Sequence, residues 1–447
     1  GDGDGDGDGD GDGDGDGDPA CLTGTYAGCE FYGLKLPLRN GQVESMWPVV
    51  FTVTNVSEEP NEVVIERRLG GQWIEVAGPT VLNHLETLEH ERPASADIVY
   101  WGVGDEDSFR IRTTAPAVAN QFTANVGGAS SLVPSSAWDW DYFVVGIGTG
   151  YFEQESAHYA IIVAREDDTA VDVTLGEYSD IHSGAGIPPE AAAGASFQVV
   201  LQAGETLGLF SAGENHATLD GSRFTSDPDH PIAVYLGYQG YHRGHNEDQI
   251  RGVNQVGSEY MCPRIILNHQ YADADREWRV VSTQNGTYVD YISLNNDDFP
   301  LSPNLMSVAG TRRDYDVRYG HQVVATKPVA VTPVLDYQSI GNNTNSVSTA
   351  QLPSVDQLLD EYVIYIPDGL WTNHLLTVAQ PDGGEVSIDG NPIIPMDAQA
   401  MPDGWVRETF PLDPGVHVLS GTEPFLGVVN GWSNGENYMF IVGGAIE

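Results

Sequence analysis

Lysine, cysteine and long apolar runs are all scarce in this chain of 447 residues. Lys35 and Lys327 are its only lysines, and 65 acidic residues against 19 basic ones give a formal net charge of −46. A surface of that sign repels nucleic acid and anionic membranes, which leaves cations, neutral glycans or other copies of the chain as partners. The same composition is typical of halophilic proteins, because salt screens carboxylate repulsion, and also of acidic extracellular proteins.

The cysteine count and the lack of an apolar run narrow the class further. Three cysteines are too few for a disulfide scaffold. Two pairings fit their spacing: Cys21 with Cys29, which leaves Cys262 free, or Cys29 with Cys262. No apolar run approaches the roughly 18 residues that span a bilayer, and the chain begins with Gly rather than Met. We therefore expect an extracellular protein, secreted or at the cell surface, whose leader was removed.

Nine Gly-Asp pairs form residues 1–18 and end at Pro19. In an extended strand their carboxylates lie about 7 Å apart on one face, within the Debye length, so the tract alone is expected to be disordered. Two functional hypotheses compete with disorder: loose calcium binding along the carboxylate row, or docking on a neighbouring subunit. A specific EF-hand loop is not expected, because its twelfth position is Gly13. The candidate calcium ligands are Asp2, Asp4, Asp6, Asp8, Asp10, Asp12, Asp14, Asp16 and Asp18.

Strand patterns dominate the rest of the chain, and two of them recur in a fixed order. Period-two alternation and β-branched residues are frequent, whereas helical periodicity is scarce. An apolar residue is followed ten positions later by an aromatic one in Leu132 and Tyr142, Ile250 and Tyr260, and Leu352 and Tyr362. A proline precedes a strand of small and branched residues at Pro116, Pro231, Pro328 and Pro424. Repeats of about a hundred residues predict an all-β chain of four tandem β-sandwich (Ig-like) modules behind the low-complexity Gly-Asp tail.

Polar or Gly/Ser/Asn-rich stretches precede each apolar-to-aromatic pattern and mark the expected module boundaries. We expect a tail over residues 1–20 and modules over residues 21–129, 130–247, 248–349 and 350–447. Exchange of strands between modules is compatible with the same patterns and would shift these edges.

Four stretches of the chain resemble the N-terminal domain family of IgG Fc-binding proteins. They are residues 27–32 (AGCEFY), 132–138 (LVPSSAW), 245–250 (HNEDQI) and 351–355 (QLPSV). The family's box resembling C-x-H-x-E-E-Q-L, followed by P-x-S and an aromatic strand, maps onto residues 244–260, and the likeness covers nearly all of residues 21–447.

This resemblance implies an all-β module of secreted proteins with an extracellular, non-enzymatic, adhesive or structural role. Antibody binding does not follow from it, because the chain has only one part of the large mosaic proteins that carry the family's name. Gly244 stands where the family has a cysteine before the histidine box, which argues against a family disulfide at that place.

Two glycine motifs point towards enzymes, but their surroundings do not. Residues 431–435 match the G-x-S-x-G nucleophile elbow, yet the segment after them is expected to form a strand and contains no histidine. Residues 146–150 resemble a dinucleotide loop, but the segment after them leads into another strand instead of a helix. We therefore predict that the chain is not an enzyme, with a hydrolase as the remaining alternative.

His245, Glu247, Asp248 and Gln249 form the candidate structural or interface site. With His242 they place two imidazoles and two carboxylates within seven residues, a set that suits a divalent metal if all four converge. The tract matches the family's box and lies in a predicted loop, so hydrogen bonding within or between modules is the favoured interpretation. No cofactor is expected apart from calcium.

Two classes of function fit these observations. In the structural class, the modules form a rod or block and self-associate into a homopolymer, filament or surface layer through the acidic tail. In the binding class, they present loops to a glycan or a surface glycoprotein. Aromatic clusters around Trp138 and Tyr235 are expected mainly in cores, with sugar stacking as the alternative. We favour the structural or adhesive class over a soluble receptor.

Overall fold

The computed structural model of the chain is all-β, which confirms the predicted class. The residues that it describes are 21, 23–36, 48–92, 101–105, 108–123, 127–145, 157–188, 191–212, 218–239, 245–266, 276–294, 304–316, 319–338, 345–369, 371–433 and 436–446. The predicted calcium ligands, His242, Gly244 and residues 146–150 lie outside them. No α-helix occurs within these ranges. Their short 3-10 helices are η3 (Ser135–Ala137), η5 (Val253–Gln255), η6 (Val355–Gln357) and η7 (Pro402–Gly404).

The strands fall into four successive groups, which we call units 1 to 4. Unit 1 comprises β1 (Gly28–Leu34), β2 (Val49–Asn55), β3 (Asn61–Leu69), β4 (Gln72–Leu82), β5 (Thr87–Arg92), β7 (Ser108–Thr123) and β8 (Ala129–Ser131). Unit 2 comprises β9 (Asp141–Phe143), β10 (Ala157–Ala164), β11 (Thr169–Thr174), β12 (Ser196–Leu201), β13 (Thr206–Phe210), β14 (Arg223–Thr225), β15 (Ile232–Gln239) and β16 (His245–Gln249). Unit 3 comprises β17 (Glu259–Cys262), β18 (Arg276–Ser282), β19 (Thr287–Ser293), β20 (Asn304–Met306), β21 (Arg312–Asp316), β22 (His321–Ala325), β23 (Val329–Gln338) and β24 (Asn345–Thr349). Unit 4 comprises β25 (Leu359–Ile366), β26 (Asn373–Pro381), β27 (Val386–Ile388), β28 (Asn391–Pro392), β29 (Asp397–Ala400), β30 (Trp405–Pro411), β31 (Gly415–Ser433) and β32 (Glu436–Ile441).

Each unit contains two antiparallel sheets, and the strand order is the same in all four. The axial sheets have the orders β5-β2-β7-β8, β13-β10-β15-β16, β21-β18-β23-β24 and β30-β26-β31-β32. The second sheets have the orders β1-β7-β3-β4, β9-β14-β11-β12, β17-β22-β19-β20 and β25-β31-β27-β28. In units 1 and 4 the long strands β7 and β31 run through both sheets, whereas units 2 and 3 divide the equivalent strand in two.

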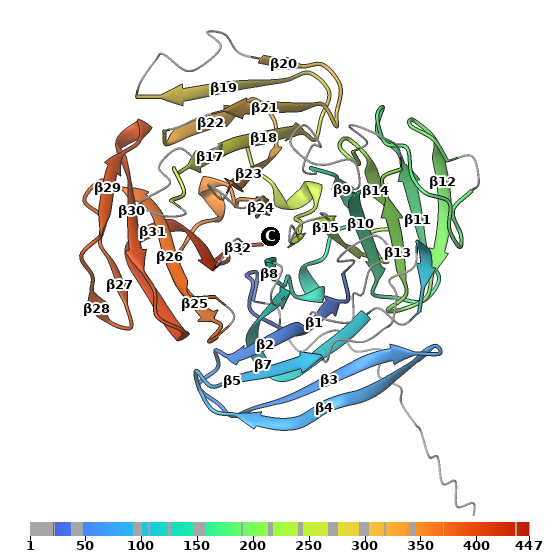
Figure 1. Ribbon diagram of the computed structural model, residues 1–447, viewed down its shortest axis with the longest axis horizontal. Helices are drawn as coiled ribbons and strands as arrows, with labels where there is room; N and C mark the ends of the chain where they lie inside the picture. Colours follow the sequence, from blue (N-terminus) through green and yellow to red (C-terminus); the bar gives the residue numbers. More distant parts are fainter. Residues whose placement is uncertain are drawn as a thin grey trace, which may run out of the picture.

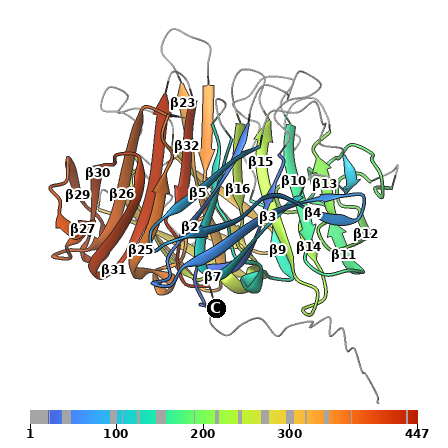
Figure 2. The same ribbon diagram turned by 90° about the horizontal axis from the view of Figure 1, so that it is seen from below.

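The four units surround a common axis instead of following one another as a rod (Figure 1). β8, β16, β24 and β32 lie around the centre, where each contacts the next and β32 contacts β8. Thr25 bridges to Ala445, and the Ile446 N–H donates to the Gly24 carbonyl at 2.7 Å, so segments near the two ends join unit 4 to unit 1. Strands near the axis, such as β23 and β32, run from one face of this disc to the other (Figure 2). The arrangement resembles a four-bladed β-propeller with two sheets in each blade.

The inner strands of the axial sheets are buried on both faces, because they also contact the neighbouring unit. On β2, Phe51 faces the core of unit 1, whereas Val50 joins the apolar cluster of unit 4. On β10, Ile162 faces the core of unit 2 and Ile161 joins the cluster of unit 1. Burial of both faces explains why these strands carry contiguous apolar runs instead of a strict alternation with polar residues.

The two recurrent sequence patterns meet in space. The Tyr142 hydroxyl accepts a hydrogen bond from the Asp139 N–H (2.9 Å) and donates to the carbonyl of Ile232 (2.8 Å), the residue after Pro231. The equivalent bonds join Tyr260 to Gly257 and Val329, and Tyr362 to Leu359 and Phe425. In unit 1 the same register position is occupied by Phe31, opposite Ile111. In three units a buried tyrosine hydroxyl therefore joins the backbone three residues before it to the strand that follows the recurrent proline.

The predicted boundaries and the cysteines can be placed on this fold. The boundaries at 129/130 and 247/248 fall within β8 and β16. β6 (Gly102–Gly104), which follows unit 1 strands in sequence, pairs with β13 and thus extends the axial sheet of unit 2. Cys21 and Cys29 form a disulfide, and Cys262 is a buried thiol whose pKa is raised by that burial.

Candidate functional site

β16 carries the residues of the predicted site, and it lies at the axis between β8 of unit 1 and β24 of unit 3. All five of its residues are buried. Because side chains alternate along a strand, one set of β16 side chains faces unit 1 and the other faces unit 3. We call residues 245–249 together with Arg251 the axial polar cluster.

The side chains towards unit 1 are those of His245, Glu247 and Gln249. A Glu247 carboxylate oxygen lies 2.8 Å from His245 Nε2 and accepts a hydrogen bond from the Thr123 hydroxyl at 2.7 Å. The Gln249 side-chain oxygen accepts a bond from the Val133 N–H at 2.8 Å. These bonds hold β16 to the end of unit 1.

The side chains towards unit 3 are those of Asn246 and Asp248. The Asn246 amide donates to the Thr349 hydroxyl at 2.7 Å, and an Asp248 carboxylate oxygen accepts a bond from the Gln351 N–H at 2.7 Å. Burial raises the pKa of Asp248 to about 8, although the Gln351 bond and the charge of Arg251 act in the opposite direction. At neutral pH this carboxyl is therefore mostly protonated.

Arg251 extends the cluster towards unit 4 and the chain ends. Its backbone N–H donates to the Gln351 side chain at 2.6 Å and its guanidinium donates to the Gln357 side chain at 3.0 Å. The guanidinium carbon also lies 5.2 Å from the centre of the Tyr26 ring. The side-chain amide of Gln357 donates to the Gln255 carbonyl, and that of Gln255 donates to the Ala137 carbonyl, so equivalent turns of successive units are linked.

The axial polar cluster is closed to solvent, with Glu247 at 0% and His245 at 1% exposure. A substrate has no access to these groups, and their bonds run between strands of different units. Within the described ranges no three His, Cys, Asp or Glu side chains are arranged to hold a metal ion. Sequence reasoning missed Asn246 and Arg251. Asn246 lies in the polar run that was expected to be a loop, whereas Arg251 is separated from that run by Ile250.

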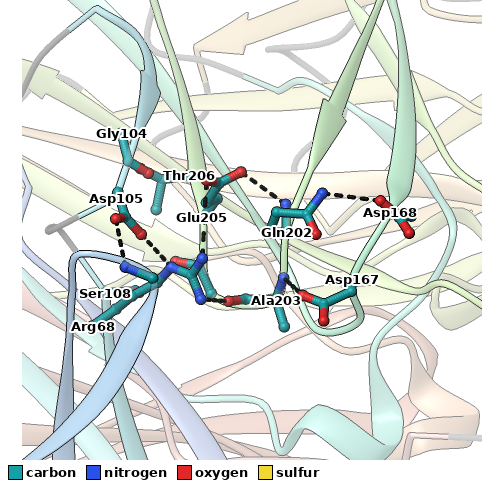
Figure 3. A network of polar contacts seen from close by, with 12 residues as sticks. Arg68, Gly104, Asp105, Ser108, Asp167, Asp168, Gln202, Ala203, Glu205 and Thr206 are labelled. Atoms are coloured by element: carbon teal, nitrogen blue, oxygen red, sulfur yellow. Dashed lines mark hydrogen bonds and ion pairs between the residues drawn. The ribbon is translucent and has the colours of Figure 1, made fainter.

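A second polar network joins units 1 and 2 on the side away from the axis (Figure 3). Arg68, which is buried, pairs with Asp105 and donates to the Ala203 carbonyl. The Ala203 N–H donates to Asp167 at 2.9 Å, and the Ser108 hydroxyl donates to the Gly204 carbonyl at 2.5 Å. The network fixes the loop after β12 against unit 1, next to the β6–β13 pairing.

A solvent-accessible pocket of about 390 Å³ lies at the seam where unit 4 meets unit 1. We call it the seam pocket. Its apolar lining includes Val56, Leu85, Val118, Leu359, Val363, Val418 and Val442. The ionisable side chains of the lining are those of Glu58, His84 and Glu361, together with two tyrosines, Tyr26 and Tyr362. His84 Nε2 lies 3.7 Å from a Glu58 carboxylate oxygen, and His84 Nδ1 lies 3.1 Å from the Ser57 carbonyl.

The remaining motifs are part of the fold. Gly431, Trp432 and Ser433 end β31, which pairs with β32, so the described residues on either side of the G-x-S-x-G match are strands and not the strand and helix of a nucleophile elbow. Trp138 and Tyr235 are buried in the core, where a sugar cannot reach them. No helix in the described part of the chain is long and apolar enough to span a membrane.

The fold and its polar contacts define the class of protein as an all-β ring held together by buried bonds between its units. The profile of the IgGFc binding protein family matches residues 128–431, which is more than half of the chain. The chain therefore belongs to the IgGFc binding protein family, a family of extracellular binding proteins, as the sequence resemblance predicted.

Two further comparisons add little. No curated protein matches the chain. A solved structure described as "Crystal structure of tetra-tandem repeat in extending region of large adhesion protein" aligns with 94% of this chain and 99% of its own at 10% identity. Its TM-score of 0.11 is too low for any conclusion about fold or function.

Proposed function

We propose that the chain is a rigid extracellular module that binds a protein partner, built from the four predicted β-sandwich modules. In this proposal His245, Glu247, Asp248 and Gln249 keep the ring closed and perform no chemistry. The observation that carries it is the burial of these side chains in bonds between units, while the seam pocket remains open to solvent. Binding, and not catalysis, is what such a surface supports.

The charge of the chain favours a partner with a basic surface. A net charge of −46 attracts cationic proteins and raises their rate of encounter at low salt. The family's name refers to the Fc part of IgG, so the Fc fragment is one candidate for the first test. A glycan is less well supported, because Trp138 and Tyr235 lie in the core.

Surface plasmon resonance with the immobilised full chain tests this function. The analytes are an Fc fragment, a lysine-rich and an arginine-rich basic protein, and a glycoprotein before and after deglycosylation. We expect saturable binding of at least one protein analyte that weakens with salt and survives deglycosylation. If nothing binds, or if binding disappears when the glycan is removed, the proposal is wrong.

Self-assembly is the second candidate, supported by the outer edge of unit 1. β4 ends its sheet and exposes Ile74, Val76 and Val81, and an exposed apolar edge strand is suited to pairing with another copy. Sedimentation velocity of the full chain, with calcium and then with chelator, measures assembly directly. We expect Val76→Lys to reduce assembly that depends on β4, and deletion of residues 1–18 to reduce assembly that depends on the Gly-Asp tract. A monomer under every condition contradicts both routes.

A further inference from the structure

The seam pocket lies between unit 1 and unit 4, two neighbouring units that do not follow each other in the sequence. Units 1 and 4 are joined there by non-covalent contacts such as the Thr25–Ala445 bridge, whereas the other neighbouring units are also linked through the chain. One wall is β25 of unit 4, and the opposite wall consists of the loops after β2 and β4 of unit 1. Anything that fills the pocket therefore contacts both sides of the seam.

The pocket combines an apolar lining with acidic groups. β25 contributes Leu359, Glu361, Tyr362 and Val363 to the pocket lining. Glu58 extends from the opposite wall, and both its side chain and that of Glu361 are exposed. No lysine or arginine among the described residues forms an ion pair with Glu58 or Glu361. Glu361 and Glu58 therefore have no arginine or lysine partner in the described part of the chain, and His84 Nε2, 3.7 Å from Glu58, is the nearest basic group that the structure places beside them.

From this arrangement, and resting on the proposed function, we infer that the seam pocket binds the side chain of an arginine or lysine on a protein partner. Both side chains have an aliphatic stem that suits the valine and leucine lining and a cationic head that suits the two carboxylates. A pocket of about 390 Å³ is within the range of sites that hold small ligands. The excess of negative charge over the whole chain favours approach of the same cation.

Calorimetric titration of the full chain with short capped peptides tests the inference. The probes are acetyl-Ala-X-Ala-amide in which X is arginine, lysine, norleucine or glutamine. We expect the arginine or lysine probe to bind and the other two to bind at least roughly 5-fold more weakly, since they lack the charge. Arginine and lysine are separated by which of the two probes binds more tightly.

A pair of matched variants locates the site. The double substitution Glu58→Gln and Glu361→Gln removes both pocket carboxylates, whereas Glu59→Gln with Asp360→Asn makes the same change in net charge at exposed neighbours outside the pocket. We expect the pocket variant to weaken the cationic probe about 5-fold or more and the control to change it less than about 2-fold. The bound probe should also raise the melting temperature of the wild-type chain, because it contacts units 1 and 4 together.

Three results would overturn the inference. Equal losses of probe affinity in the pocket variant and the control variant would show that the overall negative charge, and not the pocket, attracts the probe. The other two results are equal binding of the norleucine probe and no binding at concentrations on the order of 10 mM. Failure of the wider proposal looks different. If a protein partner binds the pocket variant as tightly as the wild type, the pocket assignment is wrong and the binding function stands. If the arginine or lysine probe binds while no protein partner does, the pocket assignment stands and the proposed binding function is wrong.

Discussion

Replacement of Tyr260 by phenylalanine tests the bond that recurs in three units. The Tyr260 hydroxyl is fully buried, donates to the Val329 carbonyl at 2.6 Å and accepts from the Gly257 N–H at 2.9 Å. Burial raises the pKa of Tyr260, so its hydroxyl stays protonated and able to donate. Phenylalanine keeps the ring but leaves the backbone groups on both sides without this partner.

The magnitude follows from the two bonds that are lost. An orphaned buried polar group costs about 1–3 kcal/mol, so the loss of two such partners is expected to lower the free energy of unfolding of Tyr260→Phe by about 2–6 kcal/mol. The Gly257 carbonyl keeps its bond from the Val329 N–H at 2.8 Å, which limits the loss to these two groups. Tyr142→Phe and Tyr362→Phe should give similar losses, because their hydroxyls make the equivalent bonds.

Equilibrium unfolding in urea, followed by tryptophan fluorescence, measures these losses. Tyr178→Phe is the matched control, since it removes the same hydroxyl from a side chain that is 70% exposed, and it should change stability by less than about 0.5 kcal/mol. If Tyr260→Phe is no more destabilising than Tyr178→Phe, the reasoning about the recurrent tyrosine is refuted.

Three further outcomes follow from the polar contacts and the disulfide. The pKa of Asp248 is raised from 3.8 to about 8 in the folded chain, so the free energy of unfolding is highest below about pH 4, falls as the pH rises towards 8 and stays low above that. Asp248→Asn should remove this loss of stability, which is worth at most about 5 kcal/mol, in unfolding curves measured between pH 4 and pH 9. Arg68→Met leaves Asp105 and the Ala203 carbonyl without their buried partner and should lower the free energy of unfolding in urea by about 2–3 kcal/mol. Reduction of the Cys21–Cys29 disulfide should destabilise the ring by roughly 2.5 kcal/mol in thermal melts, as expected for a closed loop of that length.

The two substitutions each have a control within the chain. Asp382→Asn alters an exposed turn and should leave the pH dependence unchanged. Arg165→Met alters a partly exposed side chain whose contacts to Glu30 and Glu166 are 3.6–3.7 Å long, so its cost should be under about 1 kcal/mol. Three outcomes would contradict the corresponding arguments. They are a pH dependence of Asp248→Asn parallel to that of the wild type, a loss of stability in Arg68→Met equal to that in Arg165→Met, and an unchanged melting temperature after reduction of the disulfide.

Much of the local structure was predictable because it is written into short sequence patterns. Residues 49–55 and 61–69 form the strands β2 and β3 that their β-branched residues predict, but each pairs with β7 and not with the other, so an expected hairpin between them is wrong. The recurrence of the tyrosines and of the prolines was visible as spacing, but the contact between them was not predicted. The hydroxyl bond became evident only when Tyr142 and Ile232, which are distant in sequence, were seen together.

The candidate site was less predictable than the strands. His245 to Gln249 were expected in a loop because a polar run does not resemble a strand, yet they form β16 at the axis. Polar residues are stable there because the neighbouring units supply hydrogen-bonding partners such as Thr123 and Thr349 on opposite sides. The contiguous apolar runs of β2 and β10 were the signal, unrecognised in the sequence, that their strands are covered on both faces.

The sequence by itself determined the all-β class, the membership of the family and the acidic character of the surface, because alternation, composition and motif spacing depend on residues close together in the chain. Only the tertiary structure decided that the units close into a ring, that Cys21 pairs with Cys29, and that a pocket opens between unit 4 and unit 1. Closure depends on the angle at which each unit meets the next. That angle results from many contacts between residues about a hundred positions apart, and no local pattern encodes it.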